Sequence, residues 1–305
     1  MYLGQKVLRD KLIEEVRDVV ENGSNEAVKA AGQKYLDTVN NGKENQAATE
    51  ELIAALEACG CEKAKSILAH KEYLAKKSVW VFGGDGWAYD IGFGGLDHVL
   101  ASGEDINVMV FDTEVYSNTG GQASKASQVG QVAQFAAAGK AINKKSLSEI
   151  AMSYGYVYVA QIAMGADMNQ TIKAIAEAEA YPGPSLIIGY APCEMHSIKG
   201  GMGNCQKEMK RAVECGYWNM FRFNPALKAE GKNPFTLDSK APTADYKEFI
   251  MGEAVREGCT ELSCSLRSPG TSGRTVRSKI VFRHLDPIGS SKNPAFILKA
   301  GFFSI

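Results

Sequence analysis

The sequence predicts an α/β protein built on a doubly wound parallel sheet, with an N-terminal helical appendage and an irregular C-terminal tail. Four short, almost wholly apolar runs are typical of strands buried on both faces, and they lie at residues 78–82, 106–111, 156–160 and 185–190. Helical patterns alternate with them, at residues 88–100, 129–139, 146–154 and 167–180. This alternation indicates parallel strands joined by helices. Because ligands collect at the carboxyl ends of such strands, we expect the functional residues just after each run.

The segments on either side of this core differ from it in composition. Apolar residues three and four apart, such as Leu12, Val16 and Leu52, Leu56, predict helices before residue 78. From about Ala254 the chain is rich in Ser, Arg and Gly without a sustained period, so we expect it to be loosely ordered. We therefore divide the chain into a helical appendage (1–77), the α/β core (78–252) and a divergent tail (253–305).

Composition excludes several classes of function. The 34 Lys and Arg residues nearly balance the 35 Asp and Glu residues, so charge gives no indication of a nucleic-acid or anionic membrane partner. No apolar run is long enough to cross a bilayer, and the first residues lack the apolar core of a secretion signal. The seven cysteines are scattered and odd in number, which argues against a disulfide framework. These features predict a cytoplasmic protein with free thiols.

The turn after the first strand, Gly83-Gly84-Asp85-Gly86-Trp87, allows several interpretations. A dinucleotide fingerprint lacks its third glycine, because Tyr89 stands there, and a Walker loop lacks its Gly-Lys-Ser/Thr. A metal–diphosphate site fits better, since glycines admit a diphosphate, the following helix presents free N–H groups, and Asp85 offers a carboxylate. A tight strand-to-helix turn without a ligand stays an alternative.

The second strand ends in another polar turn, residues 112–122. Mg²⁺ takes oxygen ligands in near-octahedral geometry, usually one or two carboxylates together with phosphates. Asp85 and oxygens from this neighbouring turn, with two diphosphate oxygens, would complete such a shell. The two turns together therefore predict a magnesium–diphosphate site.

The amino-acid sequence of these turns resembles that of a known family. A Gly-Asp-Gly turn followed by a polar turn some 25–30 residues later resembles the pattern of thiamine-diphosphate enzymes. Residues 79–92, 95–103 and 112–122 are more specific and resemble the thiamine domain of the pyruvate:ferredoxin (flavodoxin) oxidoreductases. The resemblance runs from about residue 1 to 252 and includes 181–185 and 232–235. It implies that residues 78–252 form a thiamine-diphosphate-binding domain.

The resemblance also implies roles for individual residues. Mg²⁺ would be held by Asp85, the hydroxyl of Thr113 and the carbonyl of Val115. Most thiamine enzymes have Asn at the position of Thr113, and a hydroxyl is an equally good oxygen ligand. Asn118 would face the substrate as a catalytic residue, where its amide can hydrogen-bond developing charge. The cradle for the diphosphate and the thiazolium would comprise Gly84, Asp85, Gly86, Trp87, Thr113, Glu114, Val115, Tyr116, Ser117 and Asn118.

Cys193 follows the fourth strand, at the edge where ligands are expected. Without further information, the alternative interpretation of Cys193 is a buried free thiol, which is common at a strand end. In the family, this position ligates the [4Fe-4S] cluster nearest the thiamine, and such a cluster takes four thiolates. The resemblance places the other three in a segment before the start of this chain, so we expect a ligand position without a loaded cluster. His98 and His196 are more typical of structural or exposed histidines.

The reaction implied by the resemblance is oxidative decarboxylation of pyruvate with coenzyme A to acetyl-CoA, with electrons passed to ferredoxin or flavodoxin. The complete enzyme would be a homodimer with further domains or subunits, one of which supplies the carboxylate that activates the cofactor. We therefore expect this chain alone to be inactive. Two alternatives stay open: a subunit of a split 2-oxoacid:ferredoxin oxidoreductase, and a truncated, non-catalytic thiamine-binding module. The sequence leaves the particular 2-oxoacid and the electron acceptor undecided.

Overall fold

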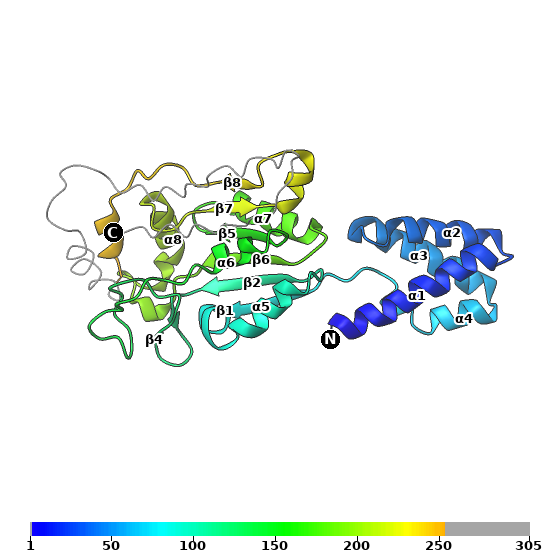
Figure 1. Cartoon of the computed structure of the whole chain (residues 1–305), viewed down its shortest axis with the longest axis horizontal. Coiled ribbons are helices and arrows are strands. Elements are labelled where there is room, and N and C mark those ends of the chain that lie inside the picture. Colours follow the sequence, from blue (N-terminus) through cyan, green and yellow to red (C-terminus); the bar gives the residue numbers. More distant parts are fainter. Residues whose placement is uncertain (1, 254–305) are drawn as a thin grey trace, which may run out of the picture. The chain divides into compact units, whose positions relative to one another are not determined.

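A six-stranded sheet forms the centre of the protein in the computed structural model, which describes residues 2–253. The predicted irregular tail, apart from Glu253, lies outside the described residues. The strands stand in the order β1-β2-β6-β5-β7-β8 (Figure 1). Their bounds are β1 Trp80–Gly84, β2 Asn107–Asp112, β5 Tyr158–Ile162, β6 Ser185–Tyr190, β7 Phe221–Phe223 and β8 Phe235–Leu237. A separate two-stranded ribbon pairs β3 (Val115–Tyr116) with β4 (Gln122–Ala123).

The four strands predicted from apolar runs are β1, β2, β5 and β6, and all of them pair in parallel. The predicted fold class is confirmed. Their bounds shift by up to two residues from the predicted runs, and β6 matches its run at both ends. The sequence did not predict β7 and β8, which extend the sheet in antiparallel pairing beyond β5.

Helices cover both faces of the sheet, as a doubly wound fold requires. Helices α5 (Phe93–Ala101), α6 (Leu147–Ser153) and α8 (Cys205–Glu214) share one apolar core with Val108 and Val110 of β2. Helix α7 (Met168–Ala180) lies on the other face, where Ala174 and Ala178 pack with Met109 of the same strand. Alternate residues of β2 therefore belong to opposite faces, which is the period of an extended chain. The short helix α9 (Tyr246–Ile250) adds Phe249 and Ile250 to the first core.

One predicted helix is wrong. Residues 129–139 form turns and isolated bridges instead of a helix. Gly130, Phe135 and Gly139 have φ values of 80°, 64° and 83°. The interior of a right-handed helix excludes such left-handed residues. The predicted helix over 88–100 is divided into a π-helical turn, η2 (Gly86–Ile91), and α5.

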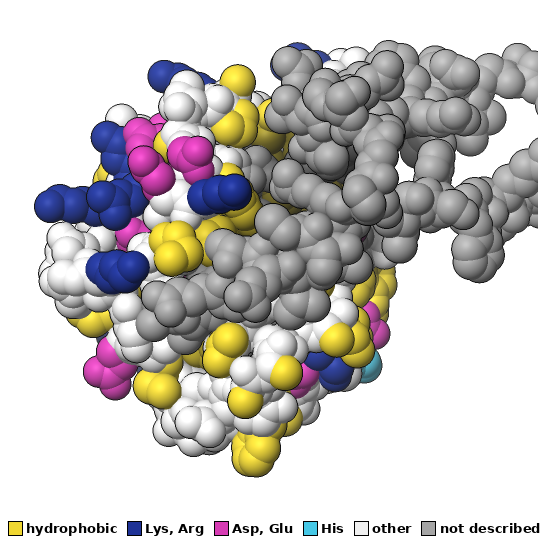
Figure 2. All heavy atoms as spheres, turned by 90° about the vertical axis from the view of Figure 1, so that its left-hand side faces the viewer, with side chains coloured by type: hydrophobic (Ala, Val, Ile, Leu, Met, Phe, Trp, Pro, Cys, Tyr) yellow, Lys and Arg dark blue, Asp and Glu magenta, His cyan; other side chains and the backbone are white. Residues whose placement is uncertain are grey.

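The parallel strands all end at the same edge of the sheet, and this edge positions the site. The register pairs Gly84 of β1 with Phe111 of β2, and Asp112 of β2 with Tyr190 of β6. The turns that follow these three strands are therefore neighbours. Figure 2 views the molecule from the side to which the arrowhead of β2 points in Figure 1, and its described atoms show basic, acidic and hydrophobic side chains interspersed.

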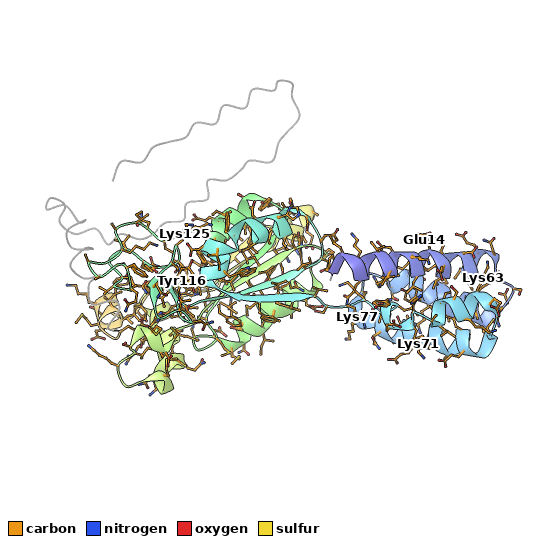
Figure 3. The ribbon with its side chains drawn as sticks, turned by 90° about the horizontal axis from the view of Figure 1, so that it is seen from below. Glu14, Lys63, Lys71, Lys77, Tyr116 and Lys125 are labelled. Atoms are coloured by element: carbon orange, nitrogen blue, oxygen red, sulfur yellow. The ribbon has the colours of Figure 1, made fainter. Side chains whose placement is uncertain are left out.

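Residues 2–74 form helices with a core of their own. The helices are α1 (Tyr2–Asn22), α2 (Glu26–Thr38), α3 (Gly42–Cys59), α4 (Glu62–Leu68) and the 3₁₀ turn η1 (Lys71–Tyr73). Asn25 and Asn41 accept backbone hydrogen bonds at the starts of α2 and α3, so each of them caps the helix that follows it. Leu12, Val16 and Leu56 are buried, while Glu14, Lys63 and Lys71 lie on the outside of these helices (Figure 3).

Among the described residues, none of the helices combines the length and the apolar character that a membrane span needs.

Candidate functional site

Three oxygen atoms from two neighbouring strand ends meet at the carboxyl edge of the sheet. The Thr113 hydroxyl oxygen lies 2.7 Å from Oδ1 of Asp85 and 2.9 Å from the carbonyl oxygen of Val115. Asp85 follows β1, and Thr113 stands between β2 and β3. These are the three residues for which the sequence suggested a metal, and the register of β1 on β2 brings them together.

The spacing of these oxygens fits a magnesium ion. With metal–oxygen distances of about 2.1 Å, neighbouring oxygens of an octahedral shell lie about 3.0 Å apart. The distances of 2.7 and 2.9 Å around Thr113 are close to that value. The Thr113 hydroxyl has a single proton, so it donates to either the carboxylate or the carbonyl, and one oxygen pair is left without a proton between them. A cation would relieve the repulsion of this pair, so the donor set suits Mg²⁺.

The Asp85 carboxylate is almost completely buried, with 1% of the residue exposed. Its Oδ2 accepts a hydrogen bond of 2.6 Å from the hydroxyl of Ser124. Burial raises the pKa of Asp85, and the bonds from Ser124 and Thr113, together with the charge of Lys144, oppose that rise. Burial disfavours the charged form of Asp85, and a bound cation would stabilise that form.

Glycines leave room for two aromatic rings beside this carboxylate. A Cβ atom on Gly86 would lie 2.5 Å from the ring of Tyr116, and one on Gly83 would lie 2.2 Å from the ring of Trp87. Both distances are far below van der Waals contact, so these positions require glycine while the rings stay in place. The glycines of the first turn therefore serve ring packing as well as the backbone approach expected from the sequence.

The second turn continues toward Cys193. Ser117 donates a hydrogen bond of 3.0 Å to the Thr113 hydroxyl, and its Oγ lies 3.3 Å from Sγ of Cys193. Cys193 thus lies at the same edge as the candidate metal ligands, two hydrogen bonds from Thr113. Asn118, expected to face the substrate, is exposed in the following turn. Among the residues described, no group of three or more His, Cys, Asp or Glu side chains could hold a metal ion.

Sequence reasoning missed Ser124 at this edge and did not predict the surroundings of His196 and Glu114. His196 is fully buried, and its Nε2 lies 2.5 Å from the carbonyl oxygen of Thr113. Because a carbonyl only accepts, Nε2 carries the proton in this contact. Ser124, which bonds Asp85, lies in a stretch that had no periodic or motif signal. Glu114, assigned to the cradle, has its side chain completely buried, away from solvent.

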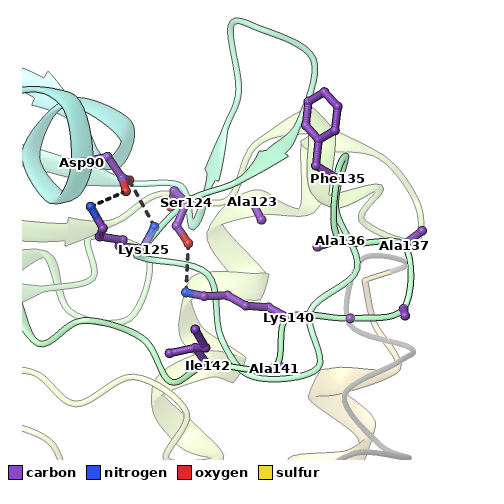
Figure 4. A pocket seen from close by; sticks show the side chains of 12 residues that line it. Asp90, Ala123, Ser124, Lys125, Phe135, Ala136, Ala137, Lys140, Ala141 and Ile142 are labelled. Atoms are coloured by element: carbon purple, nitrogen blue, oxygen red, sulfur yellow. Dashed lines mark hydrogen bonds and ion pairs between the residues drawn. The ribbon is translucent and has the colours of Figure 1, made fainter.

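A hollow opens beside Ser124, between the strand-end turns and the loop that replaces the predicted helix (Figure 4). Phe135 stands at its rim and is 95% exposed. The ammonium group of Lys140 donates to the carbonyl oxygens of Ser124 and Ser127, at 2.9 and 2.7 Å. Lys140 therefore fixes the loop to the turn that bonds Asp85.

Comparison with known proteins identifies the class of domain. Residues 54–188 match the family described as "Thiamine pyrophosphate enzyme, C-terminal TPP binding domain". This range includes Asp85, Thr113 and Val115, and it ends within β6. The α/β region is thus a thiamine-pyrophosphate-binding domain.

Relatives narrow this class to one family. The chain is 52% identical over 261 residues to a pyruvate-flavodoxin oxidoreductase of Enterobacter agglomerans, covering 83% of this chain and 22% of that protein. It is 65% identical over 183 residues to a pyruvate:ferredoxin oxidoreductase of Moorella thermoacetica, covering 60% of this chain and 16% of that protein. The chain belongs to the pyruvate:ferredoxin (flavodoxin) oxidoreductase family and corresponds to its thiamine-pyrophosphate-binding region. It spans about a fifth of the length of the first of these relatives.

Two further proteins are similar to this chain. A mitochondrial pyruvate dehydrogenase [NADP(+)] of Euglena gracilis is 50% identical over 217 residues, covering 71% of this chain and 11% of that protein. A solved 2-oxoglutarate:ferredoxin oxidoreductase of Magnetococcus marinus shares 19% identity at a TM-score of 0.39, covering 67% of this chain and 71% of that chain.

Proposed function

We propose that this chain binds Mg²⁺ and the diphosphate of thiamine pyrophosphate at the carboxyl edge of its sheet. The observation that supports this most is the cluster of Asp85, Thr113 and Val115 oxygens, spaced at 2.7 and 2.9 Å within a thiamine-pyrophosphate-binding domain. In this proposal the three oxygens hold the metal, and the backbone from Gly84 to Trp87 lies against the diphosphate at the start of η2.

The remaining residues of the cradle would orient and enclose the cofactor. Bound thiamine pyrophosphate supplies a nucleophilic carbon for breaking the bond beside the carbonyl of a 2-oxoacid. The hydroxyl of Ser117 holds Thr113 in place, and Tyr116 covers Gly86. The exposed amide of Asn118 would hydrogen-bond charge that develops on the substrate oxygen.

The complete reaction is part of the same proposal. By the names of the relatives, the whole protein would act on pyruvate and pass electrons to ferredoxin or flavodoxin. We infer coenzyme A as the acyl acceptor, a cytoplasmic location, a homodimeric enzyme and a [4Fe-4S] cluster that uses Cys193 as one of four ligands. This chain, about a fifth of its relatives in length, is then inactive by itself. Acetyl-CoA formation by the purified chain above background would contradict that part.

Calorimetric titration with thiamine pyrophosphate, with and without Mg²⁺, tests the binding proposal. We expect metal-dependent binding to the wild-type chain. We expect Asp85→Ala to weaken it by about 2–5 kcal/mol, because that change removes the one charged ligand of the proposed set. Asp97→Ala is the matched control, since this carboxylate accepts a hydrogen bond from Tyr154 on another part of the domain. Equal curves for the wild type and Asp85→Ala would refute the site.

A further inference from the structure

A buried lysine lies directly behind the turn that supplies two of the candidate metal ligands. Nζ of Lys144 lies 2.7 Å from Oδ2 of Asp112 and 3.2 Å from Oε1 of Glu114. Both carboxylates have no exposed surface, and the lysine side chain is 16% exposed. Burial opposes the charged form of Lys144, but the two carboxylates outweigh it, so the pKa of this lysine is raised. The lysine is therefore a charged anchor for both residues that precede and follow Thr113.

Aromatic side chains complete the anchor. The Tyr217 hydroxyl lies 2.8 and 2.6 Å from the two carboxylate oxygens of Glu114, and the Tyr89 hydroxyl donates a bond of 2.7 Å to Asp112. The ammonium of Lys144 lies 5.5 Å from the ring centre of Tyr89 and 5.4 Å from that of Trp218, within the range of cation–π attraction. The cluster joins β2, η2, the 140–146 segment and the chain after α8 at one point.

The backbone at this point has an unfavourable conformation. Glu114 has a φ of 59°, in the left-handed region that residues with a Cβ atom rarely adopt. This residue stands between Thr113 and Val115, so its bend directs the Thr113 hydroxyl and the Val115 carbonyl to the same place. Such a conformation persists only where the surrounding residues stabilise it. The contacts of the Glu114 carboxylate with Lys144 and Tyr217 provide this stabilisation.

We propose that Lys144 is a positioning residue for the metal–diphosphate site, which acts by holding Glu114 in its left-handed conformation. This inference rests on the proposed function, because it names the device that preforms two of the three metal-binding oxygens. In this role Lys144 acts through the turn, since its ammonium contacts Asp112 and Glu114 and none of the three proposed metal ligands. Without it, the turn would sample other conformations, and the apparent affinity for the metal and cofactor would fall with the populated fraction of the competent turn.

The chain contains a matched control for the loss of a cation between two carboxylates. Arg222 of β7 bonds Glu177 and Asp238, at 2.5 and 2.9 Å, and its side chain is 12% exposed. Arg222→Met and Lys144→Met each remove a cation that contacts two carboxylates of the same domain. Only the second change lies at the turn beside Thr113. Tyr217→Phe is a milder variant, since it removes one hydroxyl from Glu114 and keeps the ring.

The test measures two quantities in the full chain: cofactor affinity against Mg²⁺ concentration, and amide hydrogen exchange of residues 112–118 without cofactor. For Lys144→Met we expect about tenfold weaker Mg²⁺-dependent binding, with the full stoichiometry restored at high Mg²⁺, and faster exchange of the turn. For Tyr217→Phe we expect changes of the same kind but smaller, about threefold in affinity. Arg222→Met should leave both quantities at the wild-type level although it lowers thermal stability.

Two results would overturn the proposal. One is wild-type affinity and turn exchange in Lys144→Met, and the other is an equal loss of affinity in Arg222→Met, which would show general destabilisation. If Lys144→Met fails to fold, Tyr217→Phe decides in the same way. If the wild type binds no thiamine pyrophosphate, the proposed function fails, and the exchange data still decide whether Lys144 holds the turn.

Discussion

Charged side chains of the helical region form exposed ion pairs, whereas three carboxylates at the carboxyl edge of the sheet are buried. In the helices, ion pairs such as Lys34–Glu51 and Lys63–Asp18 lie on the surface, where each partner is about half exposed. At the sheet edge, the carboxylates of Asp85, Asp112 and Glu114 are buried, with at most 1% of each residue exposed. The first arrangement needs no compensation from its surroundings, whereas the second needs a hydrogen bond or a cation for every carboxylate.

The pKa values express the same difference. The Lys63 hydrogen bond lowers the pKa of the exposed Asp18 carboxyl, so the folded state favours its charge. Burial raises the pKa of Asp85 and raises that of Asp112 to about 6, so the fold works against their charges. A protein keeps carboxylates in such places when something else depends on them. This difference supports the proposed ligand site at the sheet edge, because the exposed pairs of the helices need no ligand to keep their charges.

The largest expected effect on stability comes from the core of the helical region. Leu56→Ala removes a fully buried side chain from the cluster that joins α1 to α4. Deleting such a side chain leaves a cavity and should lower the free energy of unfolding by about 2–5 kcal/mol. Chemical denaturation measures that loss. The affinity of the folded variant for Mg²⁺ and thiamine pyrophosphate should stay at the wild-type level, and a fall in parallel with stability would break the comparison.

An intermediate effect is expected at Gly86, in the first turn of the site. In Gly86→Ala the new methyl would meet the Tyr116 ring at 2.5 Å, so the ring must move, at a cost of about 1–3 kcal/mol. Because Tyr116 follows Val115 directly, we expect cofactor affinity to fall along with the melting temperature. Calorimetric titration and thermal denaturation measure the two changes.

Gly94→Ala is the control for that substitution. Gly94 lies in α5 with nothing within 4 Å of its added methyl. Alanine is the better helix former, so this variant should gain about 0.5–1 kcal/mol of stability without any change in affinity. Equal losses in both variants would show that Gly86 is an ordinary turn residue.

The sequence predicted the four parallel strands and the two turns because their signals are local. The run at Ser185–Tyr190 is almost wholly apolar and follows Pro182-Gly183-Pro184, and the structure has β6 at the same residues. Asp85 could be paired with the turn at residues 112–122 because both follow such runs and parallel strands end together, whereas the choice of Thr113 within that turn came from the family resemblance. The helix over 129–139 was wrong because its apolar spacing gave no indication that Phe135 adopts a left-handed φ.

The residues that hold the Glu114 turn in place could not be predicted from local signals. Lys144 and Tyr217 lie about 30 and 100 residues from Glu114 along the chain, and their hydrogen bonds to its carboxylate form only after folding. Lys144 stands next to Lys145, and nothing in the sequence distinguishes the buried cation from its neighbour. Motifs name the atoms that touch a ligand, whereas the residues behind them follow from three-dimensional packing.

The smallest expected effect tests the exposed half of the comparison. Nζ of Lys34 lies 2.5 and 2.6 Å from the two carboxylate oxygens of Glu51, closer than Lys144 lies to Asp112. Distance alone would therefore rank the surface pair above the buried one. Water screens the charges of Lys34 and Glu51, which are 53% and 52% exposed, and two long side chains lose rotamer freedom when they pair. Lys34→Met should lower the free energy of unfolding by about 0–1 kcal/mol in chemical denaturation and leave cofactor affinity unchanged. A loss as large as that of Leu56→Ala would mean that surface charge, and not the apolar core, stabilises the helices, and the contrast between the two regions would no longer hold.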